Sequence, residues 1–189
     1  GGPNRVAGVQ DILADCREEH AKFCVIGNGS NLLVSDAGFS GVVLRIGPAM
    51  AAIEDLGNGR IRCAAGASLT ALCNFACRQG LSGLEFAFGI PGTAGGAAYM
   101  NAGAYGGEMK DVLAACTHVA SDGSLGSFTG KALALSYRRS VYTDTDQIIT
   151  ELELQLQPGD PKSIRAAMDE KTPNRCANRT HDMPSGRNT

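Results

Sequence analysis

Two glycine-rich segments carry the residue types that could hold a phosphate group. The first, Gly27–Asn31, follows the apolar run Phe23–Ile26, and the second lies in the stretch 80–107, in which nine of 28 residues are glycine. Glycine has no Cβ, so its backbone N–H groups can approach a bound anion closely. Larger side chains interrupt the second segment and indicate an ordered structure: Ile90, Tyr99, Met100 and Tyr105. The two segments predict a phosphate cradle, and tight turns with close packing are the alternative interpretation.

The first glycine segment does not match a Rossmann dinucleotide fingerprint. That fingerprint needs a third glycine three residues after Gly29, where this chain has Leu32, and a helix after it. Leu32–Asp36 instead has the character of a strand. Asn and Ser or Thr in both segments can nevertheless hydrogen-bond to one extended ligand that carries a pyrophosphate and polar ends.

Cysteine and histidine are not spaced as metal ligands or as a catalytic triad. The seven cysteines include no C-x-x-C pair, and the three histidines are scattered. Cys73 and Cys77 share a helix face with Leu69 and Leu72, which is typical of small apolar core residues. We therefore expect neither a bound metal nor a disulfide framework.

The elements that must position the glycine segments alternate between helix and strand. Apolar spacing predicts a helix around Val9–Cys16, and short apolar runs predict buried strands at Phe23–Ile26 and Gly41–Ile46. A further strand, Arg60–Ala64, follows a hairpin turn at Gly57–Gly59. Ser68 is a predicted N-cap for a helix through Cys77 that ends at Gly80.

The second half of the chain contains strands and then turns polar. Asp122-Gly123 joins two strand-like runs, and Leu152, Leu154 and Leu156 alternate with polar residues as in a half-buried strand. One or two helical turns are predicted at Ile164–Met168, and a loop or tail from Thr172 to Thr189. The predicted class is α+β.

Composition excludes several partners. With 17 basic and 19 acidic residues, a net charge of -2 provides no field that would attract nucleic acid or an anionic membrane. No apolar run approaches the roughly 20 residues that span a bilayer, and the first residues lack the order of a secretory signal. We expect a soluble, cytoplasmic protein with a real core, 43% of its residues being apolar.

Three motifs in the same order resemble one family of enzymes. They are Gly27–Val34, the run from Gly89-Ile90-Pro91-Gly92-Thr93 to Asn101-Ala102-Gly103-Ala104-Tyr105-Gly106-Gly107, and Ser136–Tyr142. This combination, spread over roughly residues 1 to 157, strongly resembles the UDP-N-acetylenolpyruvoylglucosamine reductases, the MurB family of flavoenzymes.

The resemblance implies an FAD-binding fold of the vanillyl-alcohol-oxidase (PCMH) type with two α+β subdomains and a substrate domain that is largely missing here. We expect a first FAD-binding subdomain at 1–47 with a truncated start, a second at 48–157, and the start of the substrate domain or a disordered tail at 158–189. It further implies a monomer with non-covalent FAD, NADPH as reductant and a UDP-sugar substrate. Its reaction belongs to peptidoglycan precursor synthesis, and hence to cell wall biogenesis, cell shape and cell division.

The resemblance also assigns residues to the cofactor and the substrate. The expected FAD contacts are Gly27, Asn28, Gly29, Ser30, Asn31, Leu32, Gly89, Ile90, Pro91, Gly92, Thr93, Gly95, Gly96, Ala97, Asn101, Gly103 and Ala104. Tyr137 and Arg138 match the family's substrate-binding Tyr-Arg pair, in which the arginine is catalytic. A guanidinium stays protonated and offers a planar fork to a carboxylate, so it suits the charge that develops during reduction of an enolpyruvyl ether. Arg139 is expected at the surface.

The end of the chain departs from the family. Alignment on Pro184-Ser185 places Asn188 where the family has a proton-donating serine, and an amide cannot donate a proton as an alcohol does. Ser185 matches the other, non-catalytic serine of that motif. Two alternatives stay open: another FAD-linked oxidoreductase of the same fold, and a non-catalytic FAD-binding remnant.

Overall fold

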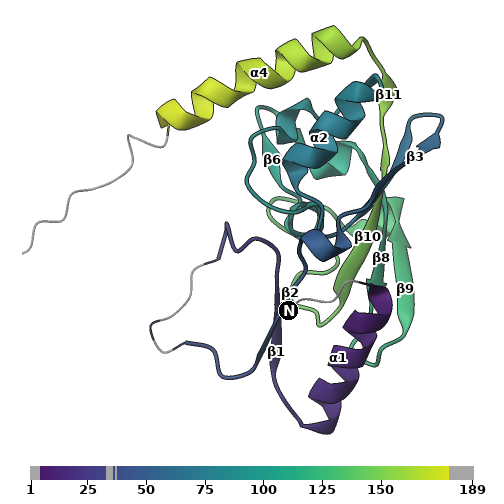
Figure 1. The fold of residues 1–189 in the computed structure, drawn as a ribbon, viewed down its shortest axis with the longest axis vertical. Helices are drawn as coiled ribbons and strands as arrows, with labels where there is room; N and C mark the ends of the chain where they lie inside the picture. The colour runs from purple at the N-terminus through teal and green to yellow at the C-terminus, as the bar shows by residue number, and fades with distance from the viewer. Residues whose placement is uncertain (1–4, 33–35, 37, 179–189) are drawn as a thin grey trace, which may run out of the picture.

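An antiparallel sheet of five strands forms the centre of the computed structural model, which describes residues 5–32, 36 and 38–178, with side chains as far as Lys171 (Figure 1). In spatial order the strands are β3 (Ile53–Gly57), β4 (Arg60–Ala64), β10 (Ile148–Gln155), β8 (Leu113–Val119) and β9 (Leu125–Thr129). β10 lies between the hairpins β3–β4 and β8–β9 and pairs antiparallel with β4 and β8. The turns at 57–59 and at 122–123 both join neighbouring strands, as predicted.

One face of this sheet is apolar and carries much of the core. Ile61 and Cys63 of β4 and Leu152 and Leu154 of β10 are completely buried. α3 (Ala94–Tyr99) packs against β4 and β10, and α2 (Leu69–Arg78) packs against α3. The predicted alternation in β10 is confirmed, because the leucines point into the core and Gln155 is exposed.

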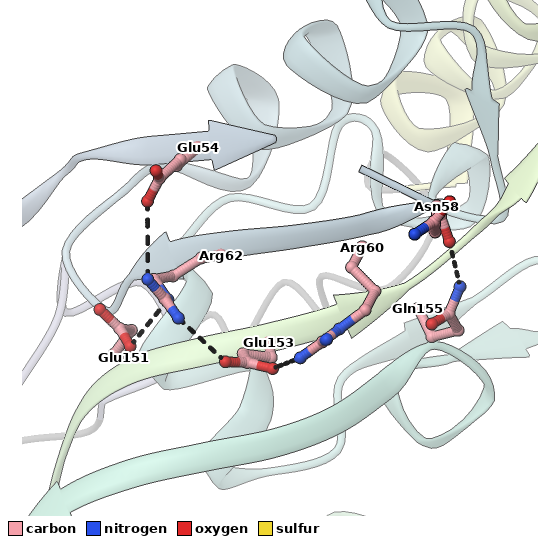
Figure 2. Close-up of polar contacts among 7 residues, drawn as sticks. All are labelled: Glu54, Asn58, Arg60, Arg62, Glu151, Glu153 and Gln155. Atoms are coloured by element: carbon pink, nitrogen blue, oxygen red, sulfur yellow. Dashed lines mark hydrogen bonds and ion pairs between the residues drawn. The ribbon is translucent and has the colours of Figure 1, made fainter. Parts of the chain in front are cut away.

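The opposite face of β3, β4 and β10 is charged (Figure 2). The guanidinium of Arg62 lies 3.6 Å from Glu54, 3.4 Å from Glu151 and 3.3 Å from Glu153. Arg60 Nη2 donates to Glu153 at 2.5 Å, and this hydrogen bond is the main cause that lowers the pKa of Glu153. These side chains are all partly exposed, and charges of opposite sign on adjacent strands pair along this outer face of the sheet.

The sequence signals around α2 are confirmed. Ser68 Oγ accepts a hydrogen bond from Ala71 N at 3.1 Å, and Gly80 adopts φ +65° directly after the C-cap residue. The buried residues of this helix are Leu69, Leu72, Cys73, Ala76 and Cys77. Cys73 and Cys77 are therefore core residues, and all six cysteines whose side chains the structure describes are free.

The first two strands form a small parallel sheet of their own. β1 (Phe23–Ile26) pairs with β2 (Val42–Arg45), but the prediction that both are buried is wrong. Val25, Val42 and Val43 are 41%, 37% and 51% exposed, and only Leu44 is buried within the pair. Each strand has one neighbour, so much of the apolar run faces outward, which the sequence pattern alone cannot reveal.

α1 (Val6–Glu18) connects this small sheet to the central one. Val9, Leu13 and Cys16 are its buried residues, as the spacing predicted. Gln10 Nε2 donates to the backbone oxygen of Gly123 at 2.7 Å, and Arg17 Nη1 donates to that of Ser121 at 2.5 Å. Both acceptors lie in the β8–β9 turn, so α1 is held at that end of the sheet (Figure 1).

The last helix is longer than predicted. α4 runs from Pro161 to Asn178 and extends beyond α2 at the top of Figure 1. The predicted loop from Thr172 is therefore wrong as far as Asn178, and 179–189 lie outside the described residues. Within the part whose side chains are described, only Ile164 and Met168 are buried. So sparse an apolar stripe gives a weak periodic signal.

Short elements complete the α+β fold. The two-stranded sheets are β5 (Leu81–Ser82) with β11 (Gln157–Pro158), and β6 (Gly103–Ala104) with β7 (Gly107–Glu108). The 3-10 turns are η1 (Pro48–Met50), η2 (Glu85–Ala87), η3 (Met109–Asp111) and η4 (Gly130–Leu133). In the described part of the chain, no helix combines the length and apolar character needed to cross a bilayer.

Candidate functional site

The structure brings the two glycine-rich segments together. The first turn follows β1, and Gly27 lies so close to Thr93 that a Cβ on it would be 2.4 Å from Thr93 Oγ1. Ser30 Oγ donates to the backbone oxygen of Pro91 at 2.9 Å. Segments more than 60 positions apart in sequence thus form one wall of a cleft, as the cradle prediction requires.

Three adjoining cavities of about 340, 290 and 530 Å³ follow this junction. The first two share Val25, Ile26, Gly27, Thr93, Gly96 and Tyr99 in their lining. The second and third share Ser30, Asn31, Ile90, Pro91, Met100, Ala102 and Arg138. A chain of cavities within the usual size range of ligand pockets suits a long ligand that touches several segments at once.

Nearly all of the predicted contact residues line these cavities. The second cavity is lined by Gly27, Asn28, Gly29, Ser30, Asn31, Leu32, Ile90, Pro91, Gly92, Thr93, Gly96 and Ala97. Gly95 lines the first cavity, and Asn101, Gly103, Tyr137 and Arg138 line the third. Gly89 and Ala104 line none of the three.

Individual glycines serve different purposes in the cleft. Gly29 has φ +68°, and nothing lies within 4 Å of the position that a Cβ would occupy, so its backbone borders open space in the second cavity. Gly95 instead packs against the central sheet, because a Cβ there would be 2.7 Å from Ala65 Cβ. The glycines therefore differ: the backbone of Gly29 is open to the cavity, as a cradle would require, whereas Gly95 permits close packing.

Thr93 links the second segment to α3. Its Oγ1 accepts a hydrogen bond from Gly96 N at 3.3 Å and caps the helix. Its backbone bridges that of Ser68, the N-cap of α2. The starts of both helices are thereby fixed beside the cleft.

Tyr137 and Arg138 are the two central residues of a tight turn at the third cavity. Ser136 and Arg139 exchange backbone hydrogen bonds of 3.1 and 3.2 Å at its base, and Arg138 has φ +54°. Tyr137 is 87% exposed. Arg138 Nη2 donates to Asn31 Oδ1 at 3.4 Å, so its guanidinium reaches across to the first glycine turn. Arg139 is an exposed residue, as expected, and forms a 3.0 Å ion pair with Asp144.

Glu108 is a titratable residue near this turn, and it also lines the third cavity. It forms an ion pair with Lys110, whose hydrogen bond is the main cause that lowers the pKa of Glu108. Glu108 is therefore ionised at neutral pH and is unsuited to donate a proton.

Several lining residues were not identified from the sequence. Thr145, Asp146 and Gln147 line the first cavity together with Tyr99. These three polar residues directly precede β10, and their local pattern is that of any loop before a strand. Pairing of β10 with β4 brings them beside the glycine segments, which is a tertiary effect.

Two further predictions concern the segment after the first glycine turn and the end of the chain. The predicted strand at Leu32–Asp36 is wrong at the described positions, since Leu32 has no regular structure and Asp36 lies in a turn, while 33–35 lie outside the described residues. Leu32 is an apolar residue that lines a cleft, 54% exposed, and such a residue resembles a strand residue in sequence. Ser185 and Asn188 lie outside the described residues.

Metal ligands do not gather in the described part of the chain. No group of three or more His, Cys, Asp or Glu side chains there is arranged to hold a metal ion.

Comparison with known proteins defines the class first. The family model described as "FAD binding domain" matches residues 2–129, and the chain belongs to this family of FAD-binding domains. The glycine cradle and the chain of cavities fit such a cofactor. Two solved structures share the fold at low identity. The structure of 6-hydroxy-D-nicotine oxidase from Arthrobacter nicotinovorans has a TM-score of 0.66 at 19% identity and covers 83% of this chain and 36% of that one. The structure of Phl p 4.0202, a glucose dehydrogenase, has a TM-score of 0.64 at 17% identity and covers 85% of this chain and 35% of that one.

Within that class the chain resembles the FAD-binding portion of UDP-N-acetylenolpyruvoylglucosamine reductases. It is 41% identical to the reductase of Geobacillus thermodenitrificans over 97% of this chain and 60% of that protein, and 38% identical to that of Listeria monocytogenes over 97% and 61%. The crystal structure of the enzyme (MurB) from Thermus caldophilus superposes with a TM-score of 0.76 at 34% identity, covering 91% of this chain and 60% of that one. The chain therefore spans about 60% of the length of these relatives. The expected α+β FAD-binding fold of the PCMH type is confirmed.

Proposed function

We propose that this chain is the FAD-binding part of a reductase that converts UDP-N-acetylenolpyruvoylglucosamine to UDP-N-acetylmuramate with NADPH as reductant. The observation that carries the proposal is the position of Arg138. It lies on the turn that borders the third cavity and reaches Asn31 of the first glycine turn at 3.4 Å. A permanently charged group thus borders the cleft that the glycine segments form.

The residues of the cleft have separate tasks in this proposal. The first turn and the segment from Gly89 to Ala104 would hold FAD, and the open space above Gly29 leaves room for a group that contacts the backbone. When bound, FAD would supply a hydride, taken from NADPH, to the terminal carbon of the enolpyruvyl group. Tyr137, largely exposed beside Arg138, would contact the substrate.

Arg138 would act as the electrostatic catalyst. Negative charge would develop on the carbon next to the site of hydride addition and be shared with the substrate carboxylate until that carbon takes up a proton, so that hydride and proton together complete the reduction. A guanidinium holds its charge at any physiological pH and can donate two parallel hydrogen bonds to a carboxylate. Its hydrogen bond to Asn31 and the turn at its base would fix its orientation before charge develops, so reorganisation during the reaction is small.

The remaining assignments belong to the same proposal. The two FAD-binding subdomains would comprise residues 1–47 and 48–157, with 158–189 leading into a substrate domain. We propose a monomeric, cytoplasmic enzyme of peptidoglycan precursor synthesis that uses neither a nucleic acid nor a membrane as partner. The low-identity fold relatives do not favour a second function.

A spectroscopic experiment on the full-length gene product tests the proposal. The purified protein should carry a flavin absorbance band that NADPH bleaches and the enolpyruvyl UDP-sugar restores, and acid precipitation should release all of the flavin. Arg138→Lys should slow the recovery of the band, while Arg139→Lys, at the adjacent exposed arginine, should leave it unchanged. Failure to bind FAD would refute the proposal. Reduction by NADPH without recovery on addition of the sugar would favour another oxidoreductase or a non-catalytic remnant.

A further inference from the structure

Asn101 occupies the base of the turn that carries Arg138. The residue is 4% exposed and has φ +46°, a left-handed conformation that asparagine tolerates better than most residues. It follows α3 and precedes the β6–β7 hairpin. It is thus a buried polar side chain in a strained backbone position, a combination that requires a compensating set of hydrogen bonds.

The amide of Asn101 connects three segments. Nδ2 donates to the backbone oxygen of Ser136 at 3.0 Å and also donates to Glu108 Oε2. Oδ1 accepts from the backbone N–H of Lys110 at 2.9 Å. An asparagine side chain has two N–H groups, and both are in use, so none is left to donate to a bound flavin.

The hydrogen bond from Asn101 to Ser136 connects the buried amide to the turn that carries Arg138. Its backbone oxygen accepts from Arg139 N to close the turn and also accepts from Asn101, so the amide holds the base of the two-residue turn whose tip is Arg138. The Glu108 carboxylate orients the amide from the other side, and Lys110 keeps that carboxylate charged. A hydrogen bond to an ionised acceptor is stronger than one between neutral groups, so the charged Glu108 holds the Asn101 amide firmly in place.

We propose that Asn101 is a positioning residue that sets the orientation of the Arg138 guanidinium through Ser136, and that its amide does not serve as a hydrogen-bond donor to FAD. This inference rests on the proposed function, because it assigns to Arg138 the stabilisation of charge on the enolpyruvyl carboxylate. It replaces the cofactor contact that the resemblance assigned to Asn101.

Asn101→Asp is the sharpest variant. Aspartate has the same shape, tolerates the same backbone conformation and keeps the oxygen that accepts from Lys110, but it loses both donors and places a second oxygen against Ser136 and Glu108. Asn101→Gly is the second variant, since it keeps the backbone conformation and removes the side chain. The matched control is Asn58→Asp, an exposed asparagine with φ +53° in the β3–β4 turn, where the same charge change meets none of these groups.

Two sets of measurements on the full-length, FAD-loaded protein separate the outcomes. With the enolpyruvyl UDP-sugar, Asn101→Asp should slow flavin reoxidation about 10- to 100-fold, as expected for a misplaced catalytic group, while the reduction by NADPH is unchanged. In an Arg138→Ala background the same substitution should have an effect of less than about 3-fold. The second measurement needs no substrate. Phenylglyoxal modifies arginine, and peptide mass spectrometry gives the labelling ratio, which is the rate of modification of Arg138 divided by that of Arg139. This ratio should change in both Asn101 variants and stay unchanged in Asn58→Asp.

The outcomes distinguish the inference from the function on which it rests. A wild-type protein that fails to reduce the enolpyruvyl sugar contradicts the proposed function, and the labelling ratio then still decides whether Asn101 positions Arg138. An unchanged labelling ratio in the Asn101 variants overturns the inference whatever the substrate. A fall in FAD affinity of more than about 10-fold in Asn101→Asp, with Asn58→Asp unaffected, overturns it as well, because Asn101 would then contact the cofactor.

Discussion

Gly27 and Thr93 form the contact that joins the two glycine segments, and substitution at Gly27 tests it directly. In Gly27→Ala the new Cβ would lie 2.4 Å from Thr93 Oγ1 and 3.3 Å from Thr93 Cγ2, so one segment has to move. Overpacking of this kind typically costs 1–3 kcal/mol, and we expect a loss of about 2 kcal/mol in the free energy of unfolding. The affinity for FAD should fall too, because the cleft opens where the segments meet.

Thr93→Ala removes the clashing atom and provides the second arm of the experiment. Alone it loses the cap on Gly96 N, which costs about 1 kcal/mol. If the two changes acted independently, the double variant would lose about 3 kcal/mol. Because the alanine also makes room for the new Cβ, we expect the double variant to lose only about 1–1.5 kcal/mol.

Urea unfolding of the apoprotein, followed by far-UV circular dichroism, measures these differences, and flavin fluorescence measures FAD affinity. Gly96→Ala is the control for the unfolding measurement alone, since its Cβ would meet Thr93 Oγ1 at an ordinary 3.4 Å and alanine favours a helix. Additive losses in the double variant would refute the reasoning, because they would mean that Gly27 is required for a reason other than its approach to Thr93.

Two further predictions concern charge and thiols. The hydrogen bond from Arg60 lowers the pKa of Glu153 in the folded protein. The pair therefore stabilises the fold at pH values above the carboxyl pKa of the unfolded chain, about 4.3. This stabilisation is lost as the pH falls through the lower pKa of the folded protein. Glu153→Gln should cost about 0.5–1 kcal/mol in urea unfolding at neutral pH, and equal destabilisation in strong acid would contradict the pairing. Cys24 is half-buried and lines the first cavity, so it should react with a thiol reagent more slowly when FAD is bound. Burial raises the pKa of Cys63 and Cys73 to about 12, and both thiols should therefore stay unreactive in the folded protein. Thiol labelling mapped by mass spectrometry checks this, and a Cys24 rate that is independent of FAD would contradict the placement of the cofactor.

Local signals in the sequence were sufficient wherever a short stretch determines its own conformation. Ser68 and Gly80 bound α2 because a cap and a left-handed terminator act within a few residues. The alternation at Leu152 and Leu154 was equally informative, since one face of β10 is buried and the other carries Glu151 and Glu153.

Features that depend on distant segments could not be obtained in this way. The apolar runs of β1 and β2 indicate strands, but their exposure depends on how many neighbours each strand has. α4 was predicted too short, because Ile164 and Met168 give little periodicity. Thr145–Gln147 enter the site through the pairing of β10 with β4. The position of Asn101 beneath the Arg138 turn depends on a backbone oxygen, a backbone N–H and a carboxylate from other segments.

The cleft is lined mainly by stretches of chain that lie far apart in the sequence: 23–32, 90–103, 106–108, 137–138 and 145–149. Few of its contacts are local, so it forms only when most of the tertiary structure is in place, late in folding. A cofactor that binds this surface stabilises the native state over the unfolded state by an amount that rises with its free concentration. The yellow colour of a purified variant will therefore report on the integrity of the whole domain, and a loss of colour identifies a contact residue only when the apoprotein is shown to be folded.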